Sequence, residues 1–285
     1  MTDVFDDRIC TLGEGPFWHP TRGQLFWFDI TGNRLLTRHA DGPQEWHLGE
    51  NVSAAGWVDH DRLIVASETA LWRFDIVMGA STRLCDLEAD NPATRSNDGR
   101  ADPQGGFWIS TMGKTEEQGA GAIWRYHRGE LRKLFPGLTI PNALCFDPGG
   151  RFAHFADTTT GRVMQVSLDP HGWPDAEPRV FLDLVAEGLN PDGAVMDADG
   201  VLWLAEWGAS RVSAYDPEGR RLRSVAFDAP HTSCPAFGGA DMATLYCTTA
   251  LKGMNEAACA AHPRAGMTFM APGIARGLPE PQVIL

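Results

Sequence analysis

Six copies of one turn-and-strand unit divide the chain along its length. Each copy opens with a short polar turn and runs into an apolar strand, and the copies occupy residues 19–29, 59–67, 102–111, 147–157, 197–207 and 239–249. Equivalent apolar residues recur at intervals of 38 to 50 residues. A repeat of this length is typical of the blades of a β-propeller. A β-sandwich with accidental repetition is a poor alternative, because all six copies are in phase.

Each copy carries three further short segments, one before the turn and two after the strand. In the first copy these are residues 14–20, 33–42 and 45–49; in the last copy the final segment is residues 281–285. No stretch keeps a 3.6-residue apolar period over three turns, so little helix is expected. The sequence therefore predicts an all-β, six-bladed propeller with four antiparallel strands per blade, as one domain spanning residues 1–285.

The N-terminal segment precedes the first complete unit. We expect it to pair with strands of the last blade, so that N- and C-terminal strands share one sheet and close the ring without leaving an exposed edge. The 31 glycines and 19 prolines among 285 residues fit a fold with many turns.

Composition excludes several classes of protein. A hydrophobic fraction of 43% is too high for a disordered chain. A net charge of −13 disfavours binding to nucleic acids or anionic membranes, which need clustered cations. The N-terminus has neither the basic nor the apolar region of a secretory signal, and none of the six cysteines forms a CxxC pair. We expect a cytoplasmic protein that is a monomer or a weak homo-oligomer.

Polar residues recur at one register of the repeat. Counting back five positions from each turn residue reaches the start of the segment that should line the central channel. The residues found there are Glu14, Ala54, Asn97, Asn142, Asp192 and, in the irregular sixth copy, Ser233 or Cys234. Equivalent positions of a propeller face one point on its axis. Four of the six therefore bring side-chain oxygens together.

Two buried carboxylates at one point would repel each other unless a cation lay between them. No lysine or histidine occurs in this register, and ligands that are all oxygen suit Ca²⁺, Mg²⁺ or Mn²⁺. The pattern favours a catalytic divalent ion with open coordination positions. A purely structural Ca²⁺ on the axis is the second interpretation. The third is that these Asn and Asp residues only support local turns.

At these same residues the chain resembles the senescence marker protein / gluconolactonase / luciferin-regenerating enzyme family, whose animal member is regucalcin. The matching segments are residues 12–18 (Leu-Gly-Glu-Gly-Pro-Phe-Trp), 95–99 (Arg-Ser-Asn-Asp-Gly) with Asp102-Pro103 and Gly105, Pro141-Asn142, residues 191–193 (Pro-Asp-Gly), and residues 234–239 with Leu245-Tyr246. They keep the family's order and cover essentially the full length.

The resemblance implies a six-bladed propeller with one divalent ion on its axis. It also implies that the protein hydrolyses sugar lactones. It assigns Glu14, Asn142 and Asp192 as metal ligands and Asp192 as the general base. The expected ion is Ca²⁺, with Zn²⁺, Mn²⁺, Mg²⁺ or Fe²⁺ as alternatives.

The resemblance also implies contacts with substrate. It assigns these contacts to Arg95 and Asn97, and to an acidic residue shortly after Thr111-Met112. Glu117 is our choice for the acidic contact, with Glu116 as the alternative. Where relatives often carry Asn-Gly, this chain has Asn142-Ala143.

Three residues have competing interpretations from the sequence. Arg95 offers a planar guanidinium for sugar hydroxyls or the product carboxylate, or else forms a surface ion pair with Asp98. Trp207 is either a platform for a sugar ring or one of ten tryptophans that pack the blades. His231 either lines the pocket or caps a loop.

The predicted function is metal-dependent hydrolysis of a sugar (aldono-) lactone to the aldonic acid in sugar catabolism. The alternatives are a non-enzymatic calcium-binding or regulatory propeller, and a related propeller esterase or organophosphate hydrolase. The sequence contains no G-x-S-x-G elbow, H-E-x-x-H pair, G-x-G-x-x-G or P-loop. Serine-triad and zinc-helix hydrolysis and a nucleotide cofactor are therefore not expected.

Overall fold

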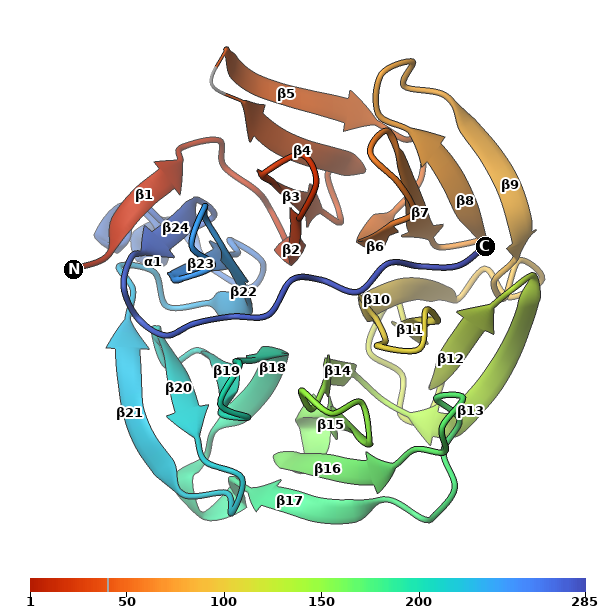
Figure 1. The fold of residues 1–285 in the computed structure, drawn as a ribbon. Helices are drawn as coiled ribbons and strands as arrows, with labels where there is room; N and C mark the ends of the chain where they lie inside the picture. The colour runs from red at the N-terminus through yellow and green to blue at the C-terminus, as the bar shows by residue number, and fades with distance from the viewer. Residues whose placement is uncertain (40) are drawn as a thin grey trace.

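Six four-stranded antiparallel sheets are arranged as a ring around a central axis (Figure 1). The computed structural model describes residues 1–39 and 41–285. This arrangement confirms the predicted six-bladed propeller with four antiparallel strands per blade. Within residues 1–39 and 41–285, helix is limited to α1 (Glu256–Ala261) and two 3₁₀ turns, η1 (Thr158–Thr160) and η2 (Val185–Glu187), as the missing helical period predicted. None of the described helices is long and apolar enough to cross a membrane.

The strands of each blade follow one another along the chain, from the axis outwards. Blade 1 consists of β2 (Gly13–His19), β3 (Gln24–Asp29), β4 (Arg34–His39) and β5 (Gly42–His47). Blade 2 consists of β6 (Val52–Trp57), β7 (Arg62–Ser67), β8 (Ala70–Asp75) and β9 (Ser81–Asp86). Blade 3 consists of β10 (Thr94–Ala101), β11 (Phe107–Gly113), β12 (Gly121–His127) and β13 (Glu130–Leu138).

The second half of the chain repeats this pattern until the ring closes. Blade 4 consists of β14 (Pro141–Phe146), β15 (Phe152–Asp157), β16 (Arg162–Ser167) and β17 (Arg179–Asp183). Blade 5 consists of β18 (Asn190–Met196), β19 (Leu202–Trp207), β20 (Arg211–Tyr215) and β21 (Arg221–Ala226). Blade 6 consists of β22 (Thr232–Gly238), β23 (Thr244–Thr249), β24 (Thr268–Ala271) and, as its outer strand, β1 (Asp3–Asp6).

Burial follows the position of a strand within its blade. All six residues of β3 are buried, because neighbouring blades cover both faces of a second strand, whereas five of the six residues of the outer strand β21 are exposed. This difference explains why the second strands are continuous apolar runs and the outer strands are polar. The turns use carboxylates: Asp197 accepts hydrogen bonds from two turn amides and from the indole of the buried Trp203.

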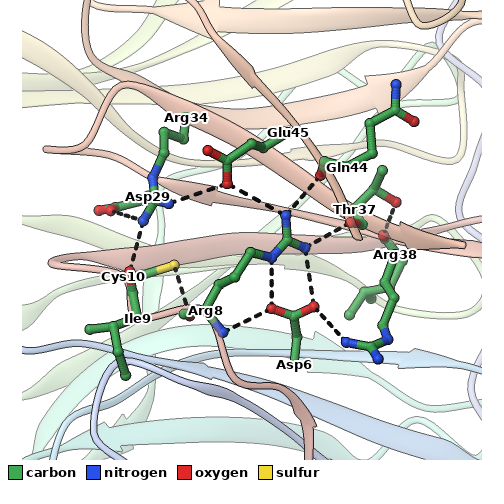
Figure 2. Close-up of polar contacts among 11 residues, drawn as sticks. Asp6, Arg8, Ile9, Cys10, Asp29, Arg34, Thr37, Arg38, Gln44 and Glu45 are labelled. Atoms are coloured by element: carbon green, nitrogen blue, oxygen red, sulfur yellow. Dashed lines mark hydrogen bonds and ion pairs between the residues drawn. The ribbon is translucent and has the colours of Figure 1, made fainter. Parts of the chain in front are cut away.

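The N-terminal segment closes the ring, as predicted. β1 pairs with β24 in blade 6, and the residues that follow it lie against blade 1. Figure 2 shows Arg8 at this junction, where it pairs with Asp6 and donates to the carbonyl oxygens of Thr37 (2.7 Å) and Gln44 (3.0 Å). Arg34 of blade 1 donates to the carbonyl of Ile9 at 2.7 Å. Charge-assisted hydrogen bonds thus join blade 1 to the segment that completes blade 6.

The C-terminal residues correct one detail of the prediction. Residues 281–285 do not form the outer strand of blade 6, because β1 occupies that edge. Instead residues 272–285 run across the face of the ring (Figure 1). This strap ends with Val283 buried against blades 2 and 3, while Glu280 forms a buried ion pair with Arg100. An apolar pattern such as Pro-Gln-Val-Ile-Leu is compatible with an edge strand or with a strap that covers a core.

Candidate active site

A cavity of about 460 Å³ opens on the axis at the end of the ring where the inner strands begin. The strap contacts the other ends of these strands, through Trp57, Gly105 and Ala198. The cavity and the strap therefore lie at opposite ends of the channel. Seven of the eight residues singled out from the sequence line the cavity, namely Glu14, Arg95, Asn97, Asn142, Asp192, Trp207 and His231.

A register shift near the start of every inner strand shapes the floor of this cavity. The shifts fall between Glu14 and Phe17, Val52 and Ala54, Ser96 and Gly99, Asn142 and Cys145, Pro191 and Ala194, and Thr232 and Cys234. A bulge of this kind bends a strand and changes the direction of its side chains. The four polar residues at the predicted register all lie at such a shift, on four different blades, and all line the cavity.

Two of the bulges require a left-handed backbone directly after the predicted metal ligand. Gly15 has φ +55° and Ala143 has φ +56°. A Cβ at Gly15 would lie 2.2 Å from the carbonyl oxygen of Ser53, so only glycine fits there. Alanine is accommodated at 143 despite its strained φ.

A chain of hydrogen bonds fixes the orientation of both carboxamides. Arg95 donates to Asn97 Oδ1 at 2.9 Å, and Asn97 Nδ2 donates to Asn142 Oδ1 at 2.8 Å. Asn142 Nδ2 then donates to Thr158 Oγ1 (2.9 Å), whose hydroxyl donates to the Pro191 carbonyl (2.7 Å). A guanidinium can only donate and a carbonyl can only accept, so the two ends determine the polarity of every bond. Asn142 Oδ1 keeps one lone pair free.

The two carboxylates of the floor are destabilised in their charged forms. Burial raises the pKa of Glu14 to about 8, and the nearby Asp98 charge adds to the rise. Burial raises the pKa of Asp192 well above its ordinary value, and the Glu14 charge is the next largest cause. No side chain among the described residues donates a hydrogen bond to either carboxylate. Arg95 is only 5% exposed, and burial lowers the pKa of its guanidinium.

These residues fit a divalent cation. Glu14, Asp192 and Asn142 Oδ1 offer oxygen ligands only. Arg95 and Lys252 line the same cavity, but among the described residues neither forms an ion pair with Glu14 or Asp192, and the pKa values of both carboxylates stay raised. Across residues 1–39 and 41–285, no three His, Cys, Asp or Glu side chains are grouped so as to hold a metal. The donor set here has two carboxylates and a carboxamide, which is a hard-cation set rather than a zinc or thiolate set.

Two aromatic rings form one wall of the cavity. Trp207 follows Glu206 at the end of β19, and its ring stacks on His231 with centroids 4.3 Å apart and an interplanar angle of 10°. Burial lowers the pKa of His231, and its Nδ1 is buried with no hydrogen-bond partner among the described atoms. Both residues line the cavity.

The structure does not place Glu117 in the cavity. Its carboxylate instead accepts a hydrogen bond from the amide of Thr115 within its own loop. Glu116, the alternative from the sequence, lines the cavity and pairs with Lys252 at 2.8 Å. The loop turns between the two residues, since Glu116 has φ +65°. The proposed ion pair between Arg95 and Asp98 is also absent: the Asp98 carboxylate accepts from the amides of Gly99 and Leu144.

Among the cavity residues that sequence reasoning missed, two make polar contacts with residues it had named. Thr158 holds Asn142 but lies in the turn after β15, outside the register that was compared. Lys252 lies in the insertion between β23 and β24, where the repeat is interrupted. No feature of the repeat pattern pointed to it, and the structure shows it paired with Glu116 at the cavity.

Comparison with known proteins identifies the family. Residues 12–251 match the model of the SMP-30/gluconolactonase/LRE-like region. A putative sugar lactone lactonase of Rhizobium meliloti is 41% identical over 279 residues, covering 94% of this chain and 95% of the relative. An L-arabinolactonase of Azospirillum brasilense is 35% identical over 272 residues, covering 93% and 89%.

A solved structure has the same fold over nearly the whole chain. It is a calcium-binding protein, regucalcin, from Agrobacterium tumefaciens, with a TM-score of 0.96 and 37% sequence identity. The match covers 99% of this chain and 97% of that structure. The match therefore spans all six blades, the strap, and the N-terminal segment that closes the ring (the clasp, β1 and the residues up to Cys10).

Proposed function

Because the chain belongs to the SMP-30/gluconolactonase/LRE-like family, we propose that it is a divalent-metal-dependent lactonase that opens a sugar lactone to the aldonic acid. One observation carries this proposal: two buried carboxylates without a side-chain donor lie in one cavity with an oriented carboxamide and a buried guanidinium. The names of two relatives, a putative sugar lactone lactonase and an L-arabinolactonase, agree with this chemistry.

Glu14, Asn142 and Asp192 would hold the cation, with Ca²⁺ as the first choice. When bound, such an ion supplies Lewis-acid polarisation of a carbonyl oxygen. Asn142 presents its oxygen because Thr158 accepts from its amino group. A fixed ligand orientation of this kind strengthens metal binding, since no reorganisation is needed.

Asp192 would act as the general base. Its carboxylate takes a proton from a water molecule while the water oxygen attacks the lactone carbonyl carbon. The ester C–O bond of the ring then breaks, and the proton is returned to the ring oxygen, which becomes a hydroxyl. The water oxygen remains in the new carboxyl group. Atoms and charges balance without any oxidant or co-substrate.

Arg95, Asn97 and the aromatic wall would position the sugar. Only one nitrogen of Arg95, Nη1, has a hydrogen-bond partner among the described atoms, so other N–H groups remain free for hydroxyls or for the product carboxylate. The Trp207–His231 surface suits stacking against the apolar face of a sugar ring. A role in sugar catabolism follows from such a substrate and product.

The decisive experiment measures acid release in a pH-stat with D-glucono-1,5-lactone and a panel of pentono- and hexonolactones, after subtraction of the rate without protein. We expect turnover that is lost on chelation and restored by Ca²⁺ or another divalent ion. Hydrolysis that survives complete chelation would refute the metal-dependent mechanism. Calcium binding without turnover across the panel would favour a regulatory calcium-binding propeller, and turnover of aryl esters alone would favour a propeller esterase.

The assignment of Asp192 is tested separately. Asp192→Ala should abolish turnover while the circular dichroism spectrum and the unfolding midpoint stay close to those of the parent, because the side chain makes no hydrogen bond to another side chain among the described residues. Near-normal turnover in this variant would show that another group is the base.

A further inference from the structure

We infer that the Lys252–Glu116 ion pair at the cavity mouth determines substrate charge: it selects lactones of neutral sugars over lactones that carry a second carboxylate. This inference rests on the proposed lactonase function and names its substrate class. It concerns the mouth of the cavity, away from the floor where the reaction takes place.

The pair joins two loops from opposite parts of the chain. Glu116 lies in the loop between β11 and β12 of blade 3, and Lys252 lies after β23 of blade 6. Lys252 Nζ and Glu116 Oε1 are 2.8 Å apart, and both residues line the cavity that contains Glu14 and Asp192. A sugar in this cavity would therefore have this pair near the part of the molecule that points away from the floor.

Backbone contacts hold both ends of the pair in place. The amide of Glu116 donates to the Gly113 carbonyl at 3.0 Å, and the side chain of Glu117 bonds within the same loop. The amide of Lys252 donates to the Thr11 carbonyl at 2.9 Å. These contacts fix the backbone on both sides of the pair, so the two charged groups are held near each other by their loops.

The charges of the cavity explain the expected selectivity. The described lining residues include three carboxylates, Glu14, Glu116 and Asp192, and two cationic side chains, Arg95 and Lys252. Lys252 is neutralised by its partner, so the mouth offers one donor and one acceptor side by side. Sugar hydroxyls both donate and accept, and they fit such a pair without being charged. A second carboxylate would have to displace Glu116 from Lys252 and would be repelled by it.

The size of the effect follows from exposure. The side chains of Lys252 and Glu116 are 38% and 47% exposed, so water screens their interaction with a ligand charge. When Glu116 is neutralised, an acidic lactone is attracted by Lys252, which has lost its partner, and is no longer repelled by Glu116. Each of these two effects changes the affinity for the acidic lactone by up to about fivefold at such a site. Neutralising Glu116 should therefore raise the relative preference for an acidic lactone by roughly fivefold to tenfold.

The experiment compares two lactones with the same ring, D-glucono-1,4-lactone and D-glucaro-1,4-lactone, which differ in a hydroxymethyl group against a carboxylate. The measured quantity is the ratio of kcat/KM for the acidic lactone to that for the neutral one. Glu116→Gln should raise this ratio about fivefold to tenfold. Adding Lys252→Met to this variant should remove the part of the gain that comes from attraction to the freed lysine. Glu130→Gln, which breaks the exposed Arg132–Glu130 pair of blade 3 outside the cavity, changes net charge equally and should leave the ratio unchanged.

Two outcomes would overturn the inference: a ratio within twofold of the parent in Glu116→Gln, or a gain that is undiminished when Lys252→Met is added. Failure of the proposed function looks different, because then neither lactone is hydrolysed by the parent protein. In that case calorimetric binding of gluconate and glucarate to the parent and to Glu116→Gln tests the charge selection on its own. Equal relative affinities in both proteins would refute it.

Discussion

His154 should make the folded protein sensitive to acid. This residue of β15 is only 2% exposed, and its ring packs edge-on against Phe181 with centroids 4.8 Å apart. Its Nε2 lies 2.9 Å from Nε2 of Gln165, whose Oε1 accepts from Arg179 at 2.6 Å. Arg179 can only donate, so Gln165 must turn its amino group towards the histidine. Nε2 of His154 is therefore an acceptor, and a second proton has no place there.

The pKa of His154 agrees with this geometry. The pKa of His154 is lowered from 6.5 to about 4, with burial as the largest cause; the charge of Asp147 opposes this shift and the charge of Arg179 adds to it. The unfolded chain binds the proton more readily than the folded protein. The contribution to stability is thus fully present above pH 6.5 and is lost as the pH falls towards 4. Between pH 7 and pH 5 the loss amounts to about 2 kcal/mol.

The test combines a titration with a substitution. Nuclear magnetic resonance of the ring should show His154 titrating near pH 4. Denaturant unfolding of the parent and of His154→Leu at pH 7 and pH 5 should show that the variant gains about 2 kcal/mol relative to the parent at the lower pH. His47→Leu, at a side chain that is 68% exposed, should show no such change. The reasoning fails if the free-energy difference between parent and His154→Leu is the same at both pH values.

Three further predictions concern single contacts. Thr158→Val should weaken Ca²⁺ binding about tenfold in calorimetry because the Asn142 amide loses its acceptor, whereas Thr158→Ser should bind like the parent. Ala143→Gly should raise the free energy of unfolding by about 1 kcal/mol, measured in urea, because glycine adopts a φ of +56° without strain. A free energy of unfolding below that of the parent would show that Ala143 is not strained. Arg125→Ala should cost about 3–5 kcal/mol by breaking a fully buried ion pair, while Arg132→Ala at an exposed pair should cost less than about 1 kcal/mol.

The floor of the site could be predicted from the repeat because propeller symmetry converts sequence register into spatial position. Counting from the turns brought together Glu14, Asn97, Asn142 and Asp192, which lie far apart in the sequence and line one cavity. The count works because, in the four blades that carry these residues, the register shift begins within one position of the same place relative to the turn. A bulge at a different position in one blade would have moved that side chain away from the axis.

The mouth of the site could not be predicted in the same way. Glu116 and Glu117 are adjacent, and only the turn of their loop decides which one reaches the cavity. Lys252 belongs to an insertion with no equivalent in the other blades. The prediction for residues 281–285 was wrong for a related reason. An apolar segment can pack against several partners, and β1 occupies the edge of blade 6 where this segment was expected.

The clasp between blades 6 and 1 also bears on the chemistry of the floor. Glu14 belongs to blade 1 and Asp192 to blade 5, so the N-terminal closure lies between them on one side of the ring. Two like charges that are both buried favour an arrangement that separates them. The contacts of Arg8 with the backbone of blade 1 oppose such a separation, because they bind blade 1 to the strand that completes blade 6. The closed ring therefore keeps Glu14 and Asp192 in one cavity, and the contacts of the N-terminal segment help to hold that arrangement.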